Sequence, residues 1–134
     1  MFTIKTLYAF SPLPQDRMAE FSQTLTQRAQ DLGVLGLVIM GKEGFNTTLC
    51  ASDEAFLDFF ITDLLKVLNI DKTSLIKTSQ SVKRPFRRFD IKIRPEIVTL
   101  DRENFVPSED HRHLSPEKWQ ELLEQDVVVI DTRN

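Results

Sequence analysis

The sequence has one cysteine, one tryptophan, one tyrosine and no long apolar run. Cys50 cannot form an internal disulfide, and without a cysteine pair the chain offers no thiolate zinc site. The ten phenylalanines carry no polar atom and are typical of core filling. No apolar run approaches the roughly 20 residues that span a bilayer, and the N-terminus lacks the pattern of a signal peptide. We therefore expect a cytoplasmic protein with no membrane partner.

The 134 residues are enough for a domain with a real hydrophobic core. The formal net charge of -3 argues against indiscriminate nucleic-acid binding but leaves room for a local basic patch. Such a patch lies between residues 83 and 94, where six cations face one acid, Asp90. The six cations are Lys83, Arg84, Arg87, Arg88, Lys92 and Arg94. The stretch is either an edge strand kept soluble by charge or a surface that binds a polyanion.

Periodicity predicts the order strand, helix, strand, strand, helix, strand, followed by one more strand. Two helical segments carry apolar stripes, and strict alternation from Phe89 predicts a half-buried final strand. The expected strands cover residues 3–10, 34–40, 45–51 and 75–80, and the expected stripes are Met18, Phe21, Leu25, Ala29 and Leu32, then Phe56, Phe59, Phe60, Leu64, Val67 and Leu68. This order indicates an α+β, ferredoxin-like domain over residues 1–100: a split βαβ antiparallel sheet with two helices on one face.

Two helices on one face leave the other face of the sheet open. Alternation would direct Arg88, Lys92 and Arg94 toward it if Phe89 points to the helices. Asn46, Thr48 and Cys50 are expected to share it. We therefore predict a polar, cationic, uncovered sheet that suits an RNA backbone.

The chain changes character after residue 100. Residues 101–113 are polar and aperiodic, as in a linker. Ser115 and Pro116 are a cap and a first helical residue, and the apolar run 127–130 is typical of a central parallel strand. We expect residues 114–134 to be the first helix and strand of a second α/β domain that is truncated at Asn134.

Three ordered blocks of the sequence resemble one family. Residues 42–48 resemble its Pro-Glu-Gly-Ile-Asn-Gly-Thr hairpin, with Lys42 and Thr47 in place of a proline and a glycine. Residues 85–100 resemble its Pro-Phe-x-Arg-Met…Glu-Ile-Val-Thr-Leu block, and residues 114–134 resemble the entry into its rhodanese domain. These blocks are similar to those of the rhodanese-related tRNA wobble-uridine hydroxylases.

The resemblance implies oxygen-dependent hydroxylation of C5 of the wobble uridine by the full-length protein. Molecular oxygen is then a co-substrate, no other cofactor is evident, and the partners are tRNA and the protein's own C-terminal rhodanese domain. The catalytic cysteine of the family lies in the rhodanese loop, beyond Asn134, so we expect no catalytic residue in this chain. Two alternatives remain: a non-enzymatic module that packs on its own rhodanese domain, and a sulfurtransferase.

Other candidate sites have simpler interpretations. Cys50 is expected to be an inert, packed thiol rather than a nucleophile. The two histidines between Glu109 and His113 lack the further ligands of a closed metal site, so we predict no metal. Glu43, Gly44 and Asn46 are interpreted as turn residues. Residues 11–14 contain two prolines and therefore lack the amides that an acylphosphatase needs to hold phosphate.

Overall fold

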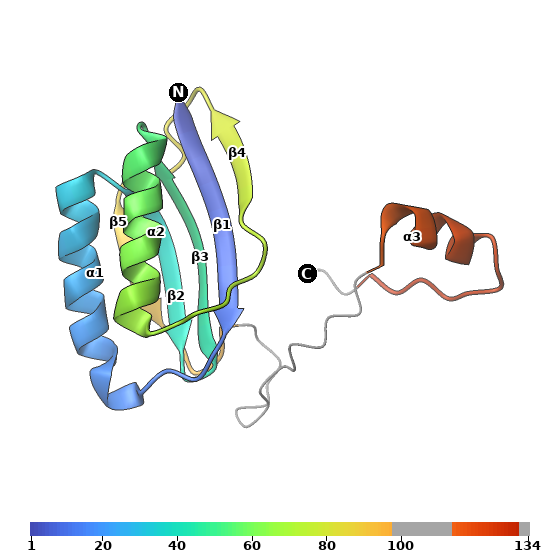
Figure 1. Ribbon diagram of the computed structural model, residues 1–134, viewed down its shortest axis with the longest axis horizontal. Coiled ribbons are helices and arrows are strands. Elements are labelled where there is room, and N and C mark those ends of the chain that lie inside the picture. The colour runs from blue at the N-terminus through green and yellow to red at the C-terminus, as the bar shows by residue number, and fades with distance from the viewer. Residues whose placement is uncertain (98–113, 132–134) are drawn as a thin grey trace.

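The computed structural model describes residues 1–97 and 114–131 and confirms the α+β prediction (Figure 1). Five strands form one sheet in the order β4-β1-β3-β2-β5. The elements are β1 (Phe2–Phe10), the 3-10 turn η1 (Gln15–Arg17), α1 (Met18–Leu32), β2 (Leu35–Gly41), β3 (Gly44–Ala51), α2 (Glu54–Leu68), β4 (Lys77–Ser81), β5 (Phe89–Ile93) and α3 (Pro116–Leu123).

Helices α1 and α2 lie side by side on one face of the sheet (Figure 1). The buried residues of α1 are Met18, Phe21, Leu25 and Ala29, as its spacing predicts. They pack with the helix-facing side chains of β1, β2 and β3 into one core. Gly33 ends α1 in the left-handed conformation, with φ of 65°, and the Asp53 side chain caps α2 by accepting from the Ala55 amide at 2.9 Å.

Strand β5 pairs with β2 in parallel, so the sheet is mixed rather than antiparallel. The four strands β4-β1-β3-β2 pair antiparallel and form the expected split βαβ arrangement. The chain reaches β5 by crossing from one edge of the sheet to the other after Ser81. Sequence periodicity sets the faces of β5 but carries no information on its partner.

The predicted stripe of α2 is partly wrong. Phe56 and Phe59 are exposed, with 45% and 56% of their surface accessible. The buried residues of α2 are Leu57, Phe60, Ile61, Leu64 and Leu68. Because α2 carries apolar residues around most of its circumference, two overlapping stripes fit the sequence, and only packing against β1 and β3 selects one.

The starts of β4 and α1 follow from local packing and turns. Strand β4 begins at Lys77 rather than the expected Leu75, which is 85% exposed. The residue before α1 is Arg17, which makes no side-chain capping bond. The proline-rich turn before it therefore sets the start of α1.

The C-terminal part contains the predicted helix α3, with the Ser115 hydroxyl accepting from the Lys118 amide at 3.2 Å and Pro116 in the first turn. The predicted strand at 127–130 is not formed; its four side chains are exposed. A strand needs a neighbouring strand to satisfy its backbone groups, and no strand of residues 1–97 and 114–131 pairs with this segment. The predicted linker, 101–113, lies outside the described residues, and the division into domains stays a prediction.

Candidate nucleic-acid interface

The six predicted RNA-contacting cations lie on or next to β5 and on residues 82–88, the crossing segment that connects β4 to β5. Four of them, Lys83, Arg84, Arg87 and Arg88, belong to the segment between β4 and β5, Lys92 lies on β5, and Arg94 follows its end. All six side chains are exposed. The structure therefore brings them to one end and one edge of the sheet.

The crossing segment has little slack. It passes from one edge of a five-stranded sheet to the other, about 19 Å at ~4.8 Å per strand. The eight steps from Ser81 to Phe89 reach at most about 26–29 Å when fully extended. Figure 1 shows the segment after β4 passing behind the sheet, on the side away from α1 and α2. The cations of this segment are thus carried across the end of the open face.

Arg84 organises the crossing segment from within. Its Nε donates to the Phe86 carbonyl at 3.0 Å, and its Nη2 donates to the Arg87 carbonyl at 2.9 Å. The Gly36 amide donates to the Arg88 carbonyl at 3.1 Å, which ties the segment to β2. The guanidinium of Arg84 therefore shapes the loop that presents Arg87 and Arg88.

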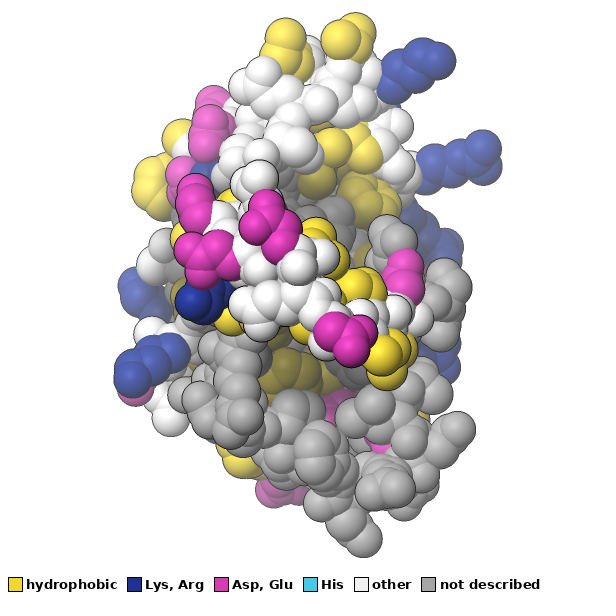
Figure 2. Space-filling model, turned by 90° about the vertical axis from the view of Figure 1, so that its right-hand side faces the viewer, with side chains coloured by type: hydrophobic (Ala, Val, Ile, Leu, Met, Phe, Trp, Pro, Cys, Tyr) yellow, Lys and Arg dark blue, Asp and Glu magenta, His cyan; other side chains and the backbone are white. Residues whose placement is uncertain are grey.

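Apart from Arg84, the cations of this cluster have little contact with acidic side chains in the described residues. The Arg88 guanidinium lies 3.6 Å from Asp90, and its side chain is 81% exposed. Exposed pairs of this kind contribute roughly 0–1 kcal/mol. Within the described ranges, this is the one ion pair among the six cations. In Figure 2, several Lys and Arg side chains project along the right-hand edge, the side opposite the helices of Figure 1.

Strand β5 divides its residues between the two faces as alternation predicts. Phe89 packs edge-on against Phe60 of α2, with ring centroids 5.4 Å apart, and Ile91 packs against the core. Asp90 and Lys92 alternate with these residues and therefore face the open side, beside Leu37 and Ile39 of β2. Lys92, the one basic residue of β5, thus belongs to the open face.

The open face is less polar than predicted. Strand register places its residues in rows, one of which is Tyr8, Asn46, Ile39 and Lys92 and the next Lys77, Thr6, Thr48, Leu37 and Asp90. The hydroxyls of Thr6 and Thr48 are hydrogen-bonded at 3.1 Å. Aliphatic and aromatic side chains of β1 and β2 fill much of the centre, and cations lie at both edges. The expectation of a uniformly polar surface is wrong because β1 and β2 carry apolar residues on both sides.

Sequence reasoning missed Tyr8 and Phe10 as candidate functional residues. Both are partly exposed, and their rings pack edge-on with centroids 5.7 Å apart. The signal was present, because alternation in residues 3–10 separates Thr6, Tyr8 and Phe10 from the buried Leu7 and Ala9. The interpretation of the ten phenylalanines as core filling included Phe10, and no role was assigned to Tyr8.

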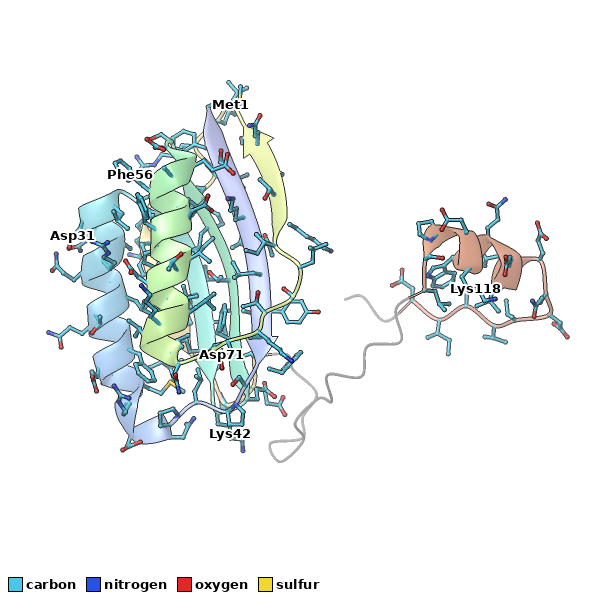
Figure 3. All side chains as sticks on the ribbon, in the orientation of Figure 1. Met1, Asp31, Lys42, Phe56, Asp71 and Lys118 are labelled. Atoms are coloured by element: carbon cyan, nitrogen blue, oxygen red, sulfur yellow. The ribbon has the colours of Figure 1, made fainter. Side chains whose placement is uncertain are left out.

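The hairpin between β2 and β3 contacts β1 and the residues that follow β5. Gly44 has φ of 142°, and a Cβ there would lie 2.0 Å from the Ala9 carbonyl oxygen. Glu43 is 5% exposed, and its carboxylate accepts a hydrogen bond from the Ile97 amide. Figure 3 shows Lys42, in the same turn, at the end of the sheet opposite Met1. Glu43 therefore holds the chain shortly after β5, Gly44 packs closely against β1, and Asn46 faces the open side of the sheet.

Cys50 is fully buried on the open-face side of β3, beneath the crossing segment. Burial raises the pKa of its thiol above the ordinary value, although a hydrogen bond from the Phe86 backbone and the Arg84 charge act in the opposite direction. A raised pKa and no access to solvent do not suit a nucleophile.

No anion cradle forms in the loop between β1 and α1. Pro12 and Pro14 have no amide hydrogen, and the Leu13 amide donates to the Lys42 carbonyl at 3.0 Å. The Arg17 amide donates to the Pro14 carbonyl at 3.2 Å. The loop therefore cannot surround a phosphate with free amides.

Neither a metal cluster nor a membrane span is found in the described part of the chain. Those residues hold no group of three or more His, Cys, Asp or Glu side chains that could bind an ion. Residues 109–113, where the two histidines lie, are outside the described ranges. The helices described are all too short or too polar to cross a bilayer.

Comparison with known proteins identifies the family. The model of the UPF0176 acylphosphatase-like domain matches residues 2–97. The chain belongs to this family. A tRNA uridine(34) hydroxylase of Bdellovibrio bacteriovorus is 37% identical over 136 residues, covering 99% of this chain and 38% of that protein. One from Synechocystis is 33% identical and matches 99% of this chain and 47% of its own length. These relatives confirm the resemblance drawn from the three sequence blocks.

The chain spans less than half the length of these curated relatives. Among solved structures, a bacterial light-regulated adenylyl cyclase superposes with a TM-score of 0.52 at 18% identity, over 69% of this chain and 28% of that one. That likeness concerns the fold alone. This chain therefore combines membership of the UPF0176 acylphosphatase-like family with a loop after β1 that contains two prolines.

Proposed function

We propose that this domain is the N-terminal, RNA-contacting part of a tRNA uridine(34) hydroxylase. The observation that carries the proposal is the basic rim: six exposed cations on the crossing segment and β5, with a single weak ion pair among them in the described residues. Such a cluster in a protein of net charge -3 concentrates positive potential at one place. The names of the relatives supply the substrate, a tRNA.

The chemistry itself belongs to the full-length protein. The hydroxylation would consume molecular oxygen and take place in the cytoplasm, at a cysteine of a C-terminal rhodanese domain. This chain contributes binding and orientation, because its one thiol is buried with a raised pKa. Measuring 5-hydroxyuridine in tRNA, and thiosulfate:cyanide sulfur transfer, with the full-length protein separates a hydroxylase from a sulfurtransferase.

Removal of charge from the basic rim tests the RNA-contacting role. The variant Arg87→Gln/Arg88→Gln/Lys92→Gln is compared with wild type in tRNA binding by fluorescence anisotropy over a range of salt concentrations. Each phosphate contact contributes about 0.7–0.9 to the slope of log K against log salt, so we expect the slope to fall by about 2–3.

A matched control removes the same charge elsewhere. Lys42, Lys66 and Lys72 are exposed and lie on the hairpin, on α2 and before β4. Their replacement by Gln should leave the salt slope near that of wild type. Equal slopes for wild type and the rim variant would contradict the proposal.

A second function is favoured by the apolar centre of the open face. Leu35, Leu37 and Ile39 of β2 remain partly exposed there, and the segment after α3 exposes an apolar run at 127–130. The domain would then be a non-enzymatic module that packs on its own rhodanese domain. In that case rim variants change domain association in the full-length protein and leave the salt slope of tRNA binding unchanged.

A further inference from the structure

One row of side chains crosses the open face with three kinds of RNA-binding chemistry. Register aligns Tyr8 of β1 with Asn46 of β3, Asn46 with Ile39 of β2, and Ile39 with Lys92 of β5. Residues in register share a face of the sheet, so an aromatic ring, an amide and an ammonium group follow one another. From Tyr8 to Lys92 the row covers three strand intervals, about 14 Å.

The backbone of Tyr8 is fixed by Ser74, and its ring contacts Phe10. Its backbone amide donates to Ser74 Oγ at 3.0 Å, and the Ser74 amide donates to the Tyr8 carbonyl at 2.8 Å. The ring packs edge-on against Phe10 at an interplanar angle of 63°. Both rings are partly exposed. A fixed, exposed aromatic ring loses little conformational freedom when a base stacks on it.

The polar members of the row are available for binding. In the described part of the chain, neither Asn46 nor Lys92 makes a side-chain hydrogen bond or ion pair, and Asn46 is partly exposed while Lys92 is exposed. An amide donates and accepts, and so matches the edge of a base. An ammonium group matches a phosphate oxygen.

Charge favours RNA as the occupant of this face. Lys77 lies at the β4 edge of the neighbouring row, and Arg88 and Lys92 lie at the β5 edge. Asp90, the acid among them, lies 3.6 Å from Arg88. Cations at both edges of an aromatic and aliphatic centre suit a strand whose bases face the sheet and whose phosphates follow its edges.

We propose that this row binds unpaired nucleotides of an RNA loop: the Tyr8 ring stacks on a base, Asn46 hydrogen-bonds to a base edge and Lys92 contacts a phosphate. The inference rests on the proposed function and specifies it further, because paired RNA hides its bases in the stack and offers only its backbone. The row thus distinguishes looped from fully paired RNA, whereas the cations of the crossing segment act on both.

The test compares two RNA probes on the 134-residue chain. One is a hairpin with an unpaired loop, and the other is the same stem extended as a continuous duplex. Tyr8→Ala should weaken hairpin binding about 5- to 160-fold, which corresponds to the loss of one stacked base, and should leave duplex binding and the salt slope for tRNA unchanged. Tyr8→Leu, which keeps apolar volume without a flat ring, should lose as much, and Tyr8→Phe should bind as wild type.

The control is Phe56→Ala, which removes an exposed aromatic ring from α2 on the covered face of the sheet (Figure 3). It should bind both probes as wild type does. Two results overturn this inference: equal affinity of wild type for hairpin and duplex, or unchanged hairpin binding by Tyr8→Leu. The proposed function still stands in either case if the rim variant lowers the salt slope of tRNA binding. Loss of self-association in Tyr8→Leu would assign the face to a second copy of the chain and also overturn the inference. Absence of binding to the hairpin overturns the inference, and absence of tRNA binding as well overturns the proposed function.

Discussion

Lys5 offers the sharpest test of how the sheet and α2 are held together. Its side chain points from β1 toward the helix, is 10% exposed, and forms an ion pair with Glu54 at 2.9 Å and a hydrogen bond with Asp58. The two carboxylates are half exposed, at 53% and 55%. The perturbation is Lys5→Met, which removes the ammonium group and keeps most of the aliphatic stem.

The expected change in unfolding free energy follows from two opposing contributions. One ion pair at this distance has a Coulomb energy of about 6 kcal/mol at an effective dielectric constant of ~20. Desolvation of the buried ammonium group costs several kcal/mol, and the half-exposed carboxylates regain water when Lys5 is removed. We therefore expect Lys5→Met to lose about 1–2 kcal/mol of unfolding free energy. Lys5→Ala also deletes three buried methylenes at ~0.8 kcal/mol each, so about 3–4 kcal/mol should be lost.

The contribution of Lys5 should also depend on pH. Burial, the largest influence, lowers the pKa of Lys5, but the hydrogen bonds and charges of Asp58 and Glu54 together raise it above the ordinary 10.5. When the folded-state pKa of a lysine is raised, its contribution to stability is fully present below the unfolded-state pKa. That contribution is lost as the pH rises through the folded-state pKa. The stability difference between wild type and Lys5→Met should therefore shrink above about pH 10.5.

Urea unfolding of both variants and wild type, at neutral and strongly alkaline pH, measures these differences. The exposed pair between Lys118 and Glu121 is a control, and Lys118→Met should change stability by no more than the experimental error. A Lys5→Met variant as stable as wild type would show that desolvation cancels the ion pairs. A difference that grows with alkaline pH would refute the linkage argument.

Three further predictions concern the hairpin and the thiol. Gly44→Ala should lose more than about 3 kcal/mol in urea unfolding, because a Cβ meets a carbonyl oxygen of β1 at 2.0 Å and φ is positive, whereas Gly33→Ala, in open space, should lose about 1–2 kcal/mol; similar losses would contradict the steric argument. Glu43→Ala should lose about 2 kcal/mol and Glu43→Gln less than half of that, with faster hydrogen exchange at the Ile97 amide, and unchanged exchange would show that the bond is unimportant. Native Cys50 should react with a thiol reagent far more slowly than the urea-unfolded chain, and equal rates would contradict its burial.

Helix α1 could be predicted from sequence because its polar and apolar residues separate cleanly. The spacing of Met18, Phe21, Leu25 and Ala29 leaves one possible buried face, and Gly33 marks the end. Helix α2 could not be predicted as well, since its mean composition is apolar and both Phe56 and Phe60 fit a stripe. Which apolar stripe of α2 is buried depends on its contacts with β1 and β3, which are distant in sequence.

The candidate interface could be predicted only where its pattern is local in the sequence. Alternation in residues 89–93 is local, so the faces of Phe89 and Lys92 followed from the sequence. The row that joins Tyr8 to Lys92 depends on the register of four strands and on the parallel pairing of β5 with β2. Neither leaves a local mark in the sequence, so Tyr8 was not distinguished from the phenylalanines of the core.

The parallel attachment of β5 explains why the basic residues gather where they do. A strand added beside β2 and parallel to it must be reached from β4 at the far edge, so the chain crosses the end of the sheet on its open side. The crossing segment is short, is braced by Arg84 and is tied to β2 through the Gly36 amide. The backbone that carries its cations is consequently fixed before any ligand arrives, which lowers the entropic cost of binding. The same crossing buries Cys50, so the geometry that presents the basic rim also removes the chain's one thiol from solvent.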